Sequence, residues 1–446
     1  MDRLARLLFV VGLVAIAFAY GFLARSWKLP PYLPIKQAAD AGQALAEFFT
    51  NADYLEVPVR HERSGVTVLD EQRASPGLTF ISLYTGERFL ARLIDLQGNV
   101  VHEWRTSFRE VWGGVPPHVR YAADDRIIEW HGTHLYPNGD VLFNFEGQLF
   151  PYGGGLVRVD KDSNVIWKVA RNTHHSIEVA EDGTIWAPAM NYRPDGMKEL
   201  PGWEPWFYED VILKIAPDGQ ILDEISIPLA LKSLPGIMKQ KTDAFDPTHL
   251  NDVEPVSAEV AAELPMLASG DLLVSLRDIS TIVAIDPSTK AAKWAMVGRF
   301  RRQHDPDLLP GGRMMVFDNL GGSDPAACGE SRILEFDVIT WQETWRYDGC
   351  DGHRFESEVW GVQQALPNGN VLITESFGAR VFEVTRDKPA RIVWEYVNLI
   401  GERDGQKIGG AIGATRRVAP GELTFLETPA AALAPGAGAP SPHPVR

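Results

Sequence analysis

The chain has 446 residues, of which 45% are hydrophobic and 23% charged, and its 59 acidic side chains outnumber its 43 basic ones to give a net charge of −16. This composition is typical of a globular protein with a large core. Because no basic stripe runs through the body of the chain, we expect no nucleic-acid partner. Small molecules are the better candidates for its ligands.

The chain begins with an uninterrupted apolar run from Leu7 to Leu23, preceded by Arg3 and Arg6. Such a run is either a secretory signal peptide or a short membrane-spanning helix. We favour the membrane anchor, because the run continues past the A-x-A sequence at residues 17–19 that would serve as a cleavage site. Either interpretation sends the rest of the chain out of the cytoplasm, and the anchor would hold it at the periplasmic face of the membrane.

Four segments follow from composition. Residues 1–27 form the apolar segment, 28–75 a Pro-rich stalk with one short amphipathic helix, 76–427 the body, and 428–446 a tail rich in Ala, Pro and Gly. The tail cannot bury enough apolar surface to order itself and is expected to be disordered.

The body repeats one pattern of two strands that ends on a large apolar residue, which is Trp in all units but one. The six positions are Trp104, Trp167, Ile225, Trp294, Trp345 and Trp394. Turns of the Asn-Gly, Asp-Gly and Gly-Gly type lie between the units, and a further strand follows each turn. Residues of these types accept the positive φ that a tight hairpin needs. The chain is therefore predicted to be all-β.

A repeat of roughly 40 to 70 residues with four short strands is typical of a propeller blade, which must stack on its neighbours to bury both faces. We predict a six-bladed β-propeller, preceded by the N-terminal transmembrane or signal-anchor helix. Two separate β-sandwiches are the alternative, but they leave the repeat unexplained. The strand at residues 77–83 is expected to supply the missing partner of the sixth unit and so close the ring.

The two cysteines, Cys328 and Cys350, flank a predicted hairpin centred near residue 339, which is also midway between them. Cross-strand pairing would place the two sulfur atoms opposite each other. A disulfide would suit an oxidising compartment outside the cytoplasm. Two unrelated free thiols are the alternative.

Histidines recur at one position of the repeat. His131, His175 and His304 each lie eight residues before a turn glycine, and His249 precedes a similar turn by a longer segment. In a closed repeat, equivalent positions approach one another, so we expect these four imidazoles to surround one mouth of the central channel. Arg277, which follows the strand LLVSL, is expected to point into the same space. A single histidine that caps a strand or satisfies a buried carbonyl remains the alternative for each of them.

Two chemistries suit several imidazoles beside one guanidinium. The histidines would ligate a transition metal, joined by a carboxylate such as Asp305, Asp252 or Glu254. Alternatively, one histidine attacks an anionic group as a nucleophile while the other histidines and the arginine hold its oxygens. Arg277 favours the second, because a fixed guanidinium repels a metal cation and binds sulfuryl or phosphoryl oxygens bidentately. We therefore predict no metal and no cofactor.

Four stretches, HHSIEVAEDGTIW, THLNDVEP, LLVSLRDISTIVAID and QHDPDLLPGG, resemble the bacterial arylsulfotransferase family, the enzymes that need no 3′-phosphoadenylyl sulfate and are built on a six-bladed propeller. The resemblance implies that His304 carries the sulfuryl group transiently. It implies that His249, Asn251 and Arg277 hold the sulfate oxygens, and that His175 assists proton transfer or binding.

The resemblance further implies an aryl sulfate ester as donor and a phenol as acceptor. We expect His131 to line the same substrate site. The competing functions are a metal-dependent hydrolase or lyase with the histidines as ligands, and a propeller that only binds a partner.

Overall fold

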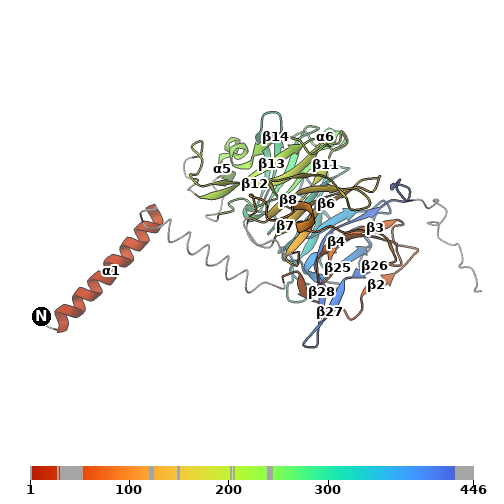
Figure 1. The fold of residues 1–446 in the computed structure, drawn as a ribbon, viewed down its shortest axis with the longest axis horizontal. Helices are drawn as coiled ribbons and strands as arrows, with labels where there is room; N and C mark the ends of the chain where they lie inside the picture. The colour runs from red at the N-terminus through yellow and green to blue at the C-terminus, as the bar shows by residue number, and fades with distance from the viewer. Residues whose placement is uncertain are drawn as a thin grey trace, which may run out of the picture. The chain divides into compact units, whose positions relative to one another are not determined.

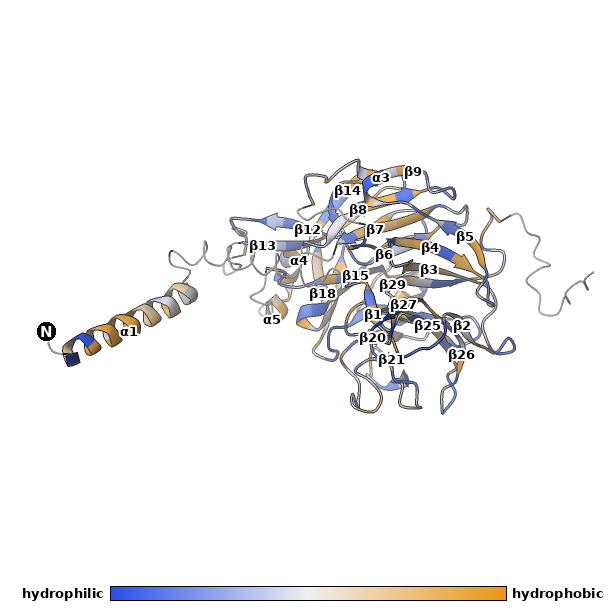
Figure 2. Cartoon of the chain, turned by 60° about the horizontal axis from the view of Figure 1, so that its bottom comes forward, coloured by the Kyte–Doolittle hydropathy of each residue, from blue (hydrophilic) through white to orange (hydrophobic). Residues whose placement is uncertain are grey.

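The computed structural model describes residues 3–27, 30, 54–119, 125–147, 151–200, 203, 206–238 and 245–426. The chain divides into two units, Met1–Ala52 and Asp53–Arg446, which are described separately. In the first unit, helix α1 (Arg3–Trp27) has a stretch, Ala5–Ala24, that is long and apolar enough to cross a membrane. Figure 2 colours most of this helix as hydrophobic. The predicted stalk helix and the tail from Thr428 lie outside the described residues.

The described part of the second unit contains six blade-like sheets (Figure 1). Five of them run from inner to outer strand in chain order, whereas the first begins with the C-terminal strand β29. The first three are β29 (Ile412–Val418), β3 (Leu78–Tyr84), β4 (Phe89–Ile94), β5 (Val100–Trp104); β6 (Ile128–Leu135), β7 (Val141–Gly147), β8 (Gly153–Val159), β9 (Val165–Val169); and β10 (Asn172–Thr173) with β11 (Glu178–Val179), β12 (Ile185–Arg193), β13 (Phe207–Ile215), β14 (Ile221–Ser226). The last three are β15 (Leu250–Pro255), β16 (Leu272–Leu276), β17 (Thr281–Asp286), β18 (Ala291–Val297); β19 (His304–Leu309), β20 (Arg313–Asp318), β21 (Arg332–Asp337), β22 (Glu343–Tyr347); and β23 (Val362–Ala365), β24 (Val371–Glu375), β25 (Arg380–Val384), β26 (Ile392–Val397).

Short elements complete the unit. A small sheet holds β1 (Glu56–Pro58), β28 (Gln406–Gly410) and β27 (Leu399–Arg403), and β2 (Gly65–Leu69) adds a fifth strand beside β26. The helices are α3 (Phe108–Trp112), α4 (Ile227–Ala230), α5 (Pro235–Met238) and α6 (Ala258–Glu263), with 3₁₀ turns η1 (Leu231–Ser233), η2 (Arg277–Ile279) and η3 (Ser376–Gly378).

The six sheets confirm the predicted propeller. Each of the six Trp-type positions lies in the outer strand of a different sheet, and neighbouring sheets contact each other through their inner strands. Trp104 and Trp394 are fully buried. The repeated large residue therefore marks where one blade packs on the next.

Closure of the ring differs from the prediction. The strand at 77–83 was expected to complete the sixth unit, but β3 pairs with β4 and with the C-terminal strand β29 in the first blade. The sixth blade is complete without it, because β23 to β26 follow one another along the chain. Figure 2 shows β29 beside β3 and β6. Both ends of the body thus meet in one blade, and residues 56–58 and 65–69 of the predicted stalk also form strands of the body.

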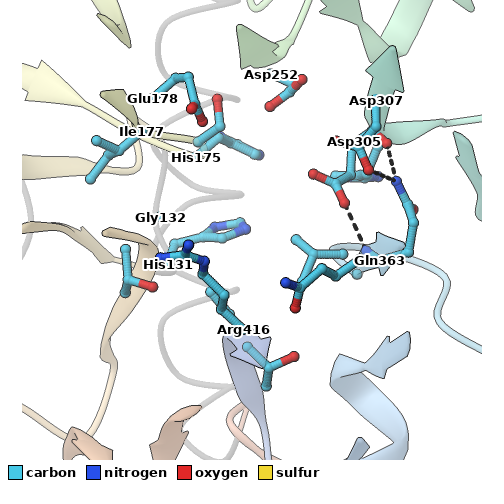
Figure 3. A pocket seen from close by; sticks show the side chains of 18 of the residues that line it. His131, Gly132, His175, Ile177, Glu178, Asp252, Asp305, Asp307, Gln363 and Arg416 are labelled. Carbon is cyan, nitrogen blue, oxygen red and sulfur yellow. Dashed lines mark hydrogen bonds between the residues drawn. The ribbon is translucent and has the colours of Figure 1, made fainter. Parts of the chain in front are cut away.

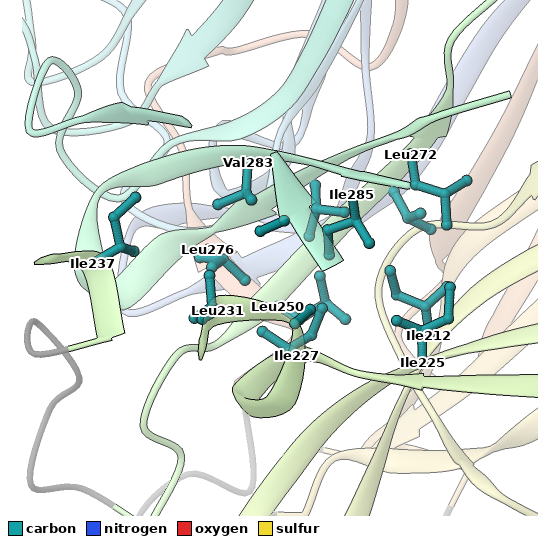
Figure 4. Packing of buried hydrophobic residues seen from close by; sticks show 14 of the residues in the cluster. Ile212, Ile225, Ile227, Leu231, Ile237, Leu250, Leu272, Leu276, Val283 and Ile285 are labelled. Carbon is teal, nitrogen blue, oxygen red and sulfur yellow. The ribbon is translucent and has the colours of Figure 1, made fainter. Parts of the chain in front are cut away.

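Apolar side chains fill the space between blades. Figure 4 shows the packing of the third blade on the fourth, where Ile212 and Ile225 face the cluster that contains Leu250, Leu272 and Val283. Removing such side chains from water stabilises the fold by about 25 cal/mol per Å² of apolar surface.

The predicted disulfide joins Cys328 to Cys350 just outside the hairpin of β21 and β22, with their Cα atoms 4.5 Å apart. The apolar helix and the disulfide together indicate export from the cytoplasm.

Ring closure through β29 leads to a truncation prediction. A chain ending at residue 411 should lose cooperative thermal unfolding and aggregate, because it leaves one edge of β3 without a partner. A chain ending at residue 426 keeps β29 and should melt at the temperature of the full-length protein. Equal melting temperatures and equal monomer fractions for the two truncations would contradict closure by this strand.

Candidate functional site

The predicted histidines lie at or beside interruptions of the inner strands. The register of β6 shifts between Trp130 and Thr133, that of β15 between Leu250 and Asp252, and that of β19 between His304 and Asp307. In the third blade the inner strand is broken outright, and residues 174–177 fill the gap between β10 and β11. Bulges of this kind re-aim side chains next to functional sites.

The backbone adopts unusual conformations at these interruptions. His175, His249 and Asp305 have positive φ values of 55°, 52° and 49°. Gly132, next to His131, approaches the third blade so closely that an added Cβ would lie 1.9 Å from the His175 carbonyl oxygen. A left-handed backbone conformation costs free energy for residues other than glycine. Packing of the surrounding structure therefore has to stabilise these positions.

The structure brings the four predicted histidines together around His175. Its ring centroid lies 4.8 Å from that of His131, 5.1 Å from that of His249 and 6.4 Å from that of His304. All four side chains are buried. The preceding residue, His174, is also fully buried, with its Nδ1 atom 2.9 Å from Nδ1 of His175.

His304 has a defined tautomer. Its Nδ1 atom lies 2.8 Å from Oδ1 of Asn319 and 3.1 Å from the carbonyl oxygen of Arg302. Both partners accept hydrogen bonds, because the Asn319 amide nitrogen donates to the carbonyls of Ser357 and Trp360. The proton therefore sits on Nδ1, and Nε2 carries a lone pair. Burial, and then the charge of Arg277, lower the pKa of His304 well below its ordinary value, so the ring is neutral at pH 7.

The surroundings of His249, in contrast, favour its protonated form. Its Nδ1 atom lies 2.6 Å from Oδ2 of Asp246, and its backbone N–H donates to Oδ1 of the same carboxylate. Burial opposes the charged imidazole, but the attraction of Asp246 outweighs burial and raises the pKa of His249. The site thus pairs a neutral histidine with one that favours the protonated state.

His131 and His175 share the carboxylate of Glu146. Nδ1 of His131 lies 3.2 Å from Glu146, and Nδ1 of His175 lies 3.8 Å from it. Among the described residues, these three side chains form a group that could hold a metal ion, because their potential ligand atoms all lie within 4.8 Å of one another. Burial and the charge of Glu146 raise the pKa of the neighbouring Glu129.

Arg277 faces one side of the histidines and borders a cavity of about 110 Å³. We call it the arginine cavity; its walls include His175, His249, Arg277, His304, Tyr54, Tyr152, Trp360 and the carboxyl groups of Glu129 and Glu146. Arg277 as a whole is only 9% exposed, and one guanidinium nitrogen donates to Asp278, but its buried Nε has no acceptor within the described residues. A buried cation with an unused donor suits an anion.

A second cavity, of about 280 Å³, lies on the other side and shares His175 and His304 with the first. We call it the acidic chamber, since Glu178, Asp252, Asp305 and Asp307 line it (Figure 3). Asn251, expected at the sulfate oxygens, lines this chamber rather than the arginine cavity, and its Nδ2 donates to the Gln303 carbonyl.

Sequence reasoning missed the partners of the histidines. Asp246 lies three residues before His249, a spacing that would have suggested the pair. Asn319 directly follows β20, the strand beside that of His304, and Glu146 lies in β7, the strand beside that of His131; no local pattern marks either residue.

A family model described as "Arylsulfotransferase (ASST)" matches residues 132–399, which is more than half of the chain. No curated protein matches. Among solved structures, a protein of unknown function from Bacteroides caccae is 13% identical, with a TM-score of 0.48 and coverage of 76% of this chain and 98% of its own.

Two further solved structures share the low similarity. The β-propeller domain of Cps50 (Swd1) from Myceliophteria thermophila is 10% identical, with a TM-score of 0.40 and coverage of 74% of this chain and 88% of its own. A catalytically inactive virginiamycin B lyase from Staphylococcus aureus is 11% identical, with a TM-score of 0.38 and coverage of 78% and 92%. Likenesses this weak carry no information about function.

Proposed function

The chain belongs to the arylsulfotransferase family, which implies arylsulfotransferase-like activity on aryl sulfates, and we propose that it transfers the sulfuryl group to a phenol through a transient sulfohistidine at His304. One observation carries this proposal: the buried Arg277 Nε lacks an acceptor in the same cavity that contains the neutral His304. An anion bound by that guanidinium would lie beside a free imidazole lone pair.

The sulfate ester would bind by charge. Arg277 and the protonated His249 would each donate to sulfate oxygens, because charge-assisted hydrogen bonds are strongest in a site closed to water. His175, at the centre of the four rings, would orient the third oxygen. The aromatic walls of the cavity, together with His131, whose ring is tilted against that of Trp360 with centroids 4.7 Å apart, would hold the aryl ring. Asn251 would act indirectly, by fixing the Gln303 carbonyl immediately before His304.

In the first half-reaction, Nε2 of His304 attacks sulfur, and the bond from sulfur to the phenolic oxygen breaks. The phenolate leaves with the electron pair and takes the proton of the His249 imidazolium. In the second, an acceptor phenol returns a proton to His249 and attacks the same sulfur, the N–S bond breaks, and His304 regains its lone pair. Imidazole suits both steps, because it is neutral at physiological pH and leaves readily once sulfated.

Location is the second part of the proposal. Helix α1 would remain uncleaved as a membrane anchor and hold the propeller at the periplasmic face. The disulfide supports an oxidising compartment, and the continuous apolar run supports an anchor.

Substitution of the nucleophile is the first test. His304→Ala should abolish phenol release from a chromogenic aryl sulfate. Mass spectrometry of wild-type protein, quenched at alkaline pH after donor is added alone, should detect one SO₃ on the peptide that contains residue 304. His353→Ala, at an exposed position, serves as the matched control and should keep full activity. An SO₃ adduct on another histidine would reassign the nucleophile.

Arg277→Lys should slow transfer by about 10² to 10³, which is typical for loss of one preorganised donor. Labelling of His304 should persist, only more slowly, because the lysine keeps the charge but not the fork of donors. Single-turnover kinetics measures this rate. Transfer at the wild-type rate would remove the guanidinium from the mechanism.

The pH profile gives an independent test. Activity needs neutral His304, which is lost as pH falls through its lowered pKa, and protonated His249, which is lost as pH rises through its raised pKa. The profile of kcat/KM should therefore be bell-shaped, with an alkaline limb above the ordinary histidine pKa of about 6.5. Asp246→Asn should shift only the alkaline limb to lower pH, whereas Asp182→Asn, at an exposed turn, should shift neither. An unmoved alkaline limb in Asp246→Asn would assign that limb to another group.

A second function is favoured by one observation, the close spacing of His131, Glu146 and His175. Two imidazoles and a carboxylate are a ligand set for a transition metal in a hydrolase or lyase. Elemental analysis of the purified protein separates the two functions. A stoichiometric metal, together with activity that a chelator removes, would favour the metal-dependent enzyme; metal-free protein with full transferase activity would exclude it.

A further inference from the structure

The acidic chamber brings together four carboxyl groups with little basic charge beside them. The side chains of Glu178, Asp252, Asp305 and Asp307 line a cavity of about 280 Å³. Besides histidines, its lining contains one basic side chain, Arg416, which is exposed and pairs at 2.8 Å with Glu422. Burial raises the pKa of all four carboxyl groups, and the neighbouring carboxyl of Asp307 adds to this for the other three. A cation bound among them would stabilise their ionised forms.

Two neutral oxygens in the same lining point to a ligand independently of the carboxylates. Oδ1 of Asn251 and Oε1 of Gln363 are buried and have no hydrogen-bond partner in the described part of the chain. Their side chains belong to residues only 3% and 6% exposed. Their orientation is fixed, because the Asn251 Nδ2 donates to Gln303 and the Gln363 Nε2 donates to Asp307 at 3.0 Å. Two buried acceptors without donors cost free energy unless a bound group supplies the hydrogens.

The spacing of the oxygens favours a group larger than a metal ion. Among the described residues, no three acidic side chains of the chamber bring ligand atoms within 4.8 Å of one another, a condition that only His131, Glu146 and His175 meet. That distance is about twice a Ca²⁺–oxygen bond and marks the span of one coordination shell. An alkylammonium group has three N–H donors and longer N···O distances, so it reaches acceptors that are spread more widely.

We propose that the acidic chamber is a subsite for a protonated amine, and that the preferred acceptor is a phenol that carries an alkylammonium group. The inference rests on the proposed transferase function. His304 borders both cavities, so one molecule would present its hydroxyl to the sulfuryl group while its ammonium lies among Asp305, Asp307 and the two amide oxygens. A carboxylate-bearing phenol would be repelled by the same groups.

Three acceptors with the same phenol ring test this subsite. With a chromogenic aryl sulfate as donor and full-length protein, kcat/KM for 4-(2-aminoethyl)phenol should exceed that for 4-ethylphenol by about tenfold to a hundredfold, as expected for hydrogen bonds to a charged group. The value for 3-(4-hydroxyphenyl)propanoate should fall below both. Equal values for the three acceptors would overturn the proposal while leaving the transferase function intact.

Substitutions in the acidic chamber test whether the preference for amine-bearing acceptors arises there. Asp307→Asn, and separately Glu178→Gln from another blade, should reduce the preference for the amine and leave kcat/KM for 4-ethylphenol unchanged. Asp162→Asn, at a surface carboxylate that is 61% exposed, is the charge-matched control and should leave the preference intact. An amine preference that survives both chamber variants would place the ammonium elsewhere and contradict the proposal.

A binding measurement with an amine that cannot be sulfated tests the subsite independently of the proposed transferase function. Titration calorimetry with 2-phenylethylamine, which has no hydroxyl to sulfate, should detect binding to wild-type protein and a loss of about tenfold or more in affinity for Asp307→Asn. This result would support the subsite even if no acceptor were sulfated. Absence of binding, or displacement of the amine by a stoichiometric Ca²⁺ or Mg²⁺ ion, would overturn it.

Discussion

The pairing of β29 with β3 is the contact on which the site depends. It joins residues 412–418 to residues 78–84, the two ends of the body, and so turns a row of sheets into a ring. Arg417 reinforces this closure: its buried guanidinium contacts Thr79 within the first blade and lies 3.1 Å from Glu383 of the sixth. A buried arginine is tolerated only with such partners. Because the inner strands share one axis only in a closed ring, imidazoles from four blades meet although the chain separates them widely.

The candidate site lies where the inner strands depart from regular β-structure. Strands β6, β15 and β19 each shift register beside a predicted site residue, and the inner strand of the third blade is broken around His175. An unbroken strand would alternate its side chains between the two faces of its own blade, and consecutive residues would seldom serve one cavity. The bulges turn the histidines toward the axis. The stacked blades supply the free energy that holds His175 and His249 in left-handed conformations.

Local signals carried most of what the sequence could predict. Trp104, Trp167 and their equivalents recur at fixed places, so the all-β fold and the number of blades could be predicted. The repeated spacing of His131, His175 and His304 predicted that these imidazoles lie together, as they do. The closing strand was missed because β29, IGATRRV, has little apolar alternation and pairs with a segment far away in the chain. Asp246 and Asn319, which set the charge and tautomer of the histidines, were missed because single polar residues have no period. Asn251 lines the acidic chamber, beside a register shift that cannot be read from a motif, and its proposed role is therefore indirect.

The histidines lie between two cavities with different charged groups, and this asymmetry constrains the proposed chemistry. The arginine cavity contains Arg277 and His249, whose pKa is raised, together with the carboxyl groups of Glu129 and Glu146. On the other side, Asp305 directly follows His304 in the chain and faces the acidic chamber. Under the proposed function, a sulfate ester would bind with its oxygens toward the guanidinium, since the opposite orientation would place an anion among the carboxyl groups of the chamber. His304 lines both cavities, and burial lowers its pKa. The electrostatic field across the ring would thus fix which way the sulfuryl group faces before any bond forms, and that orientation is the part of catalysis a rigid propeller supplies best.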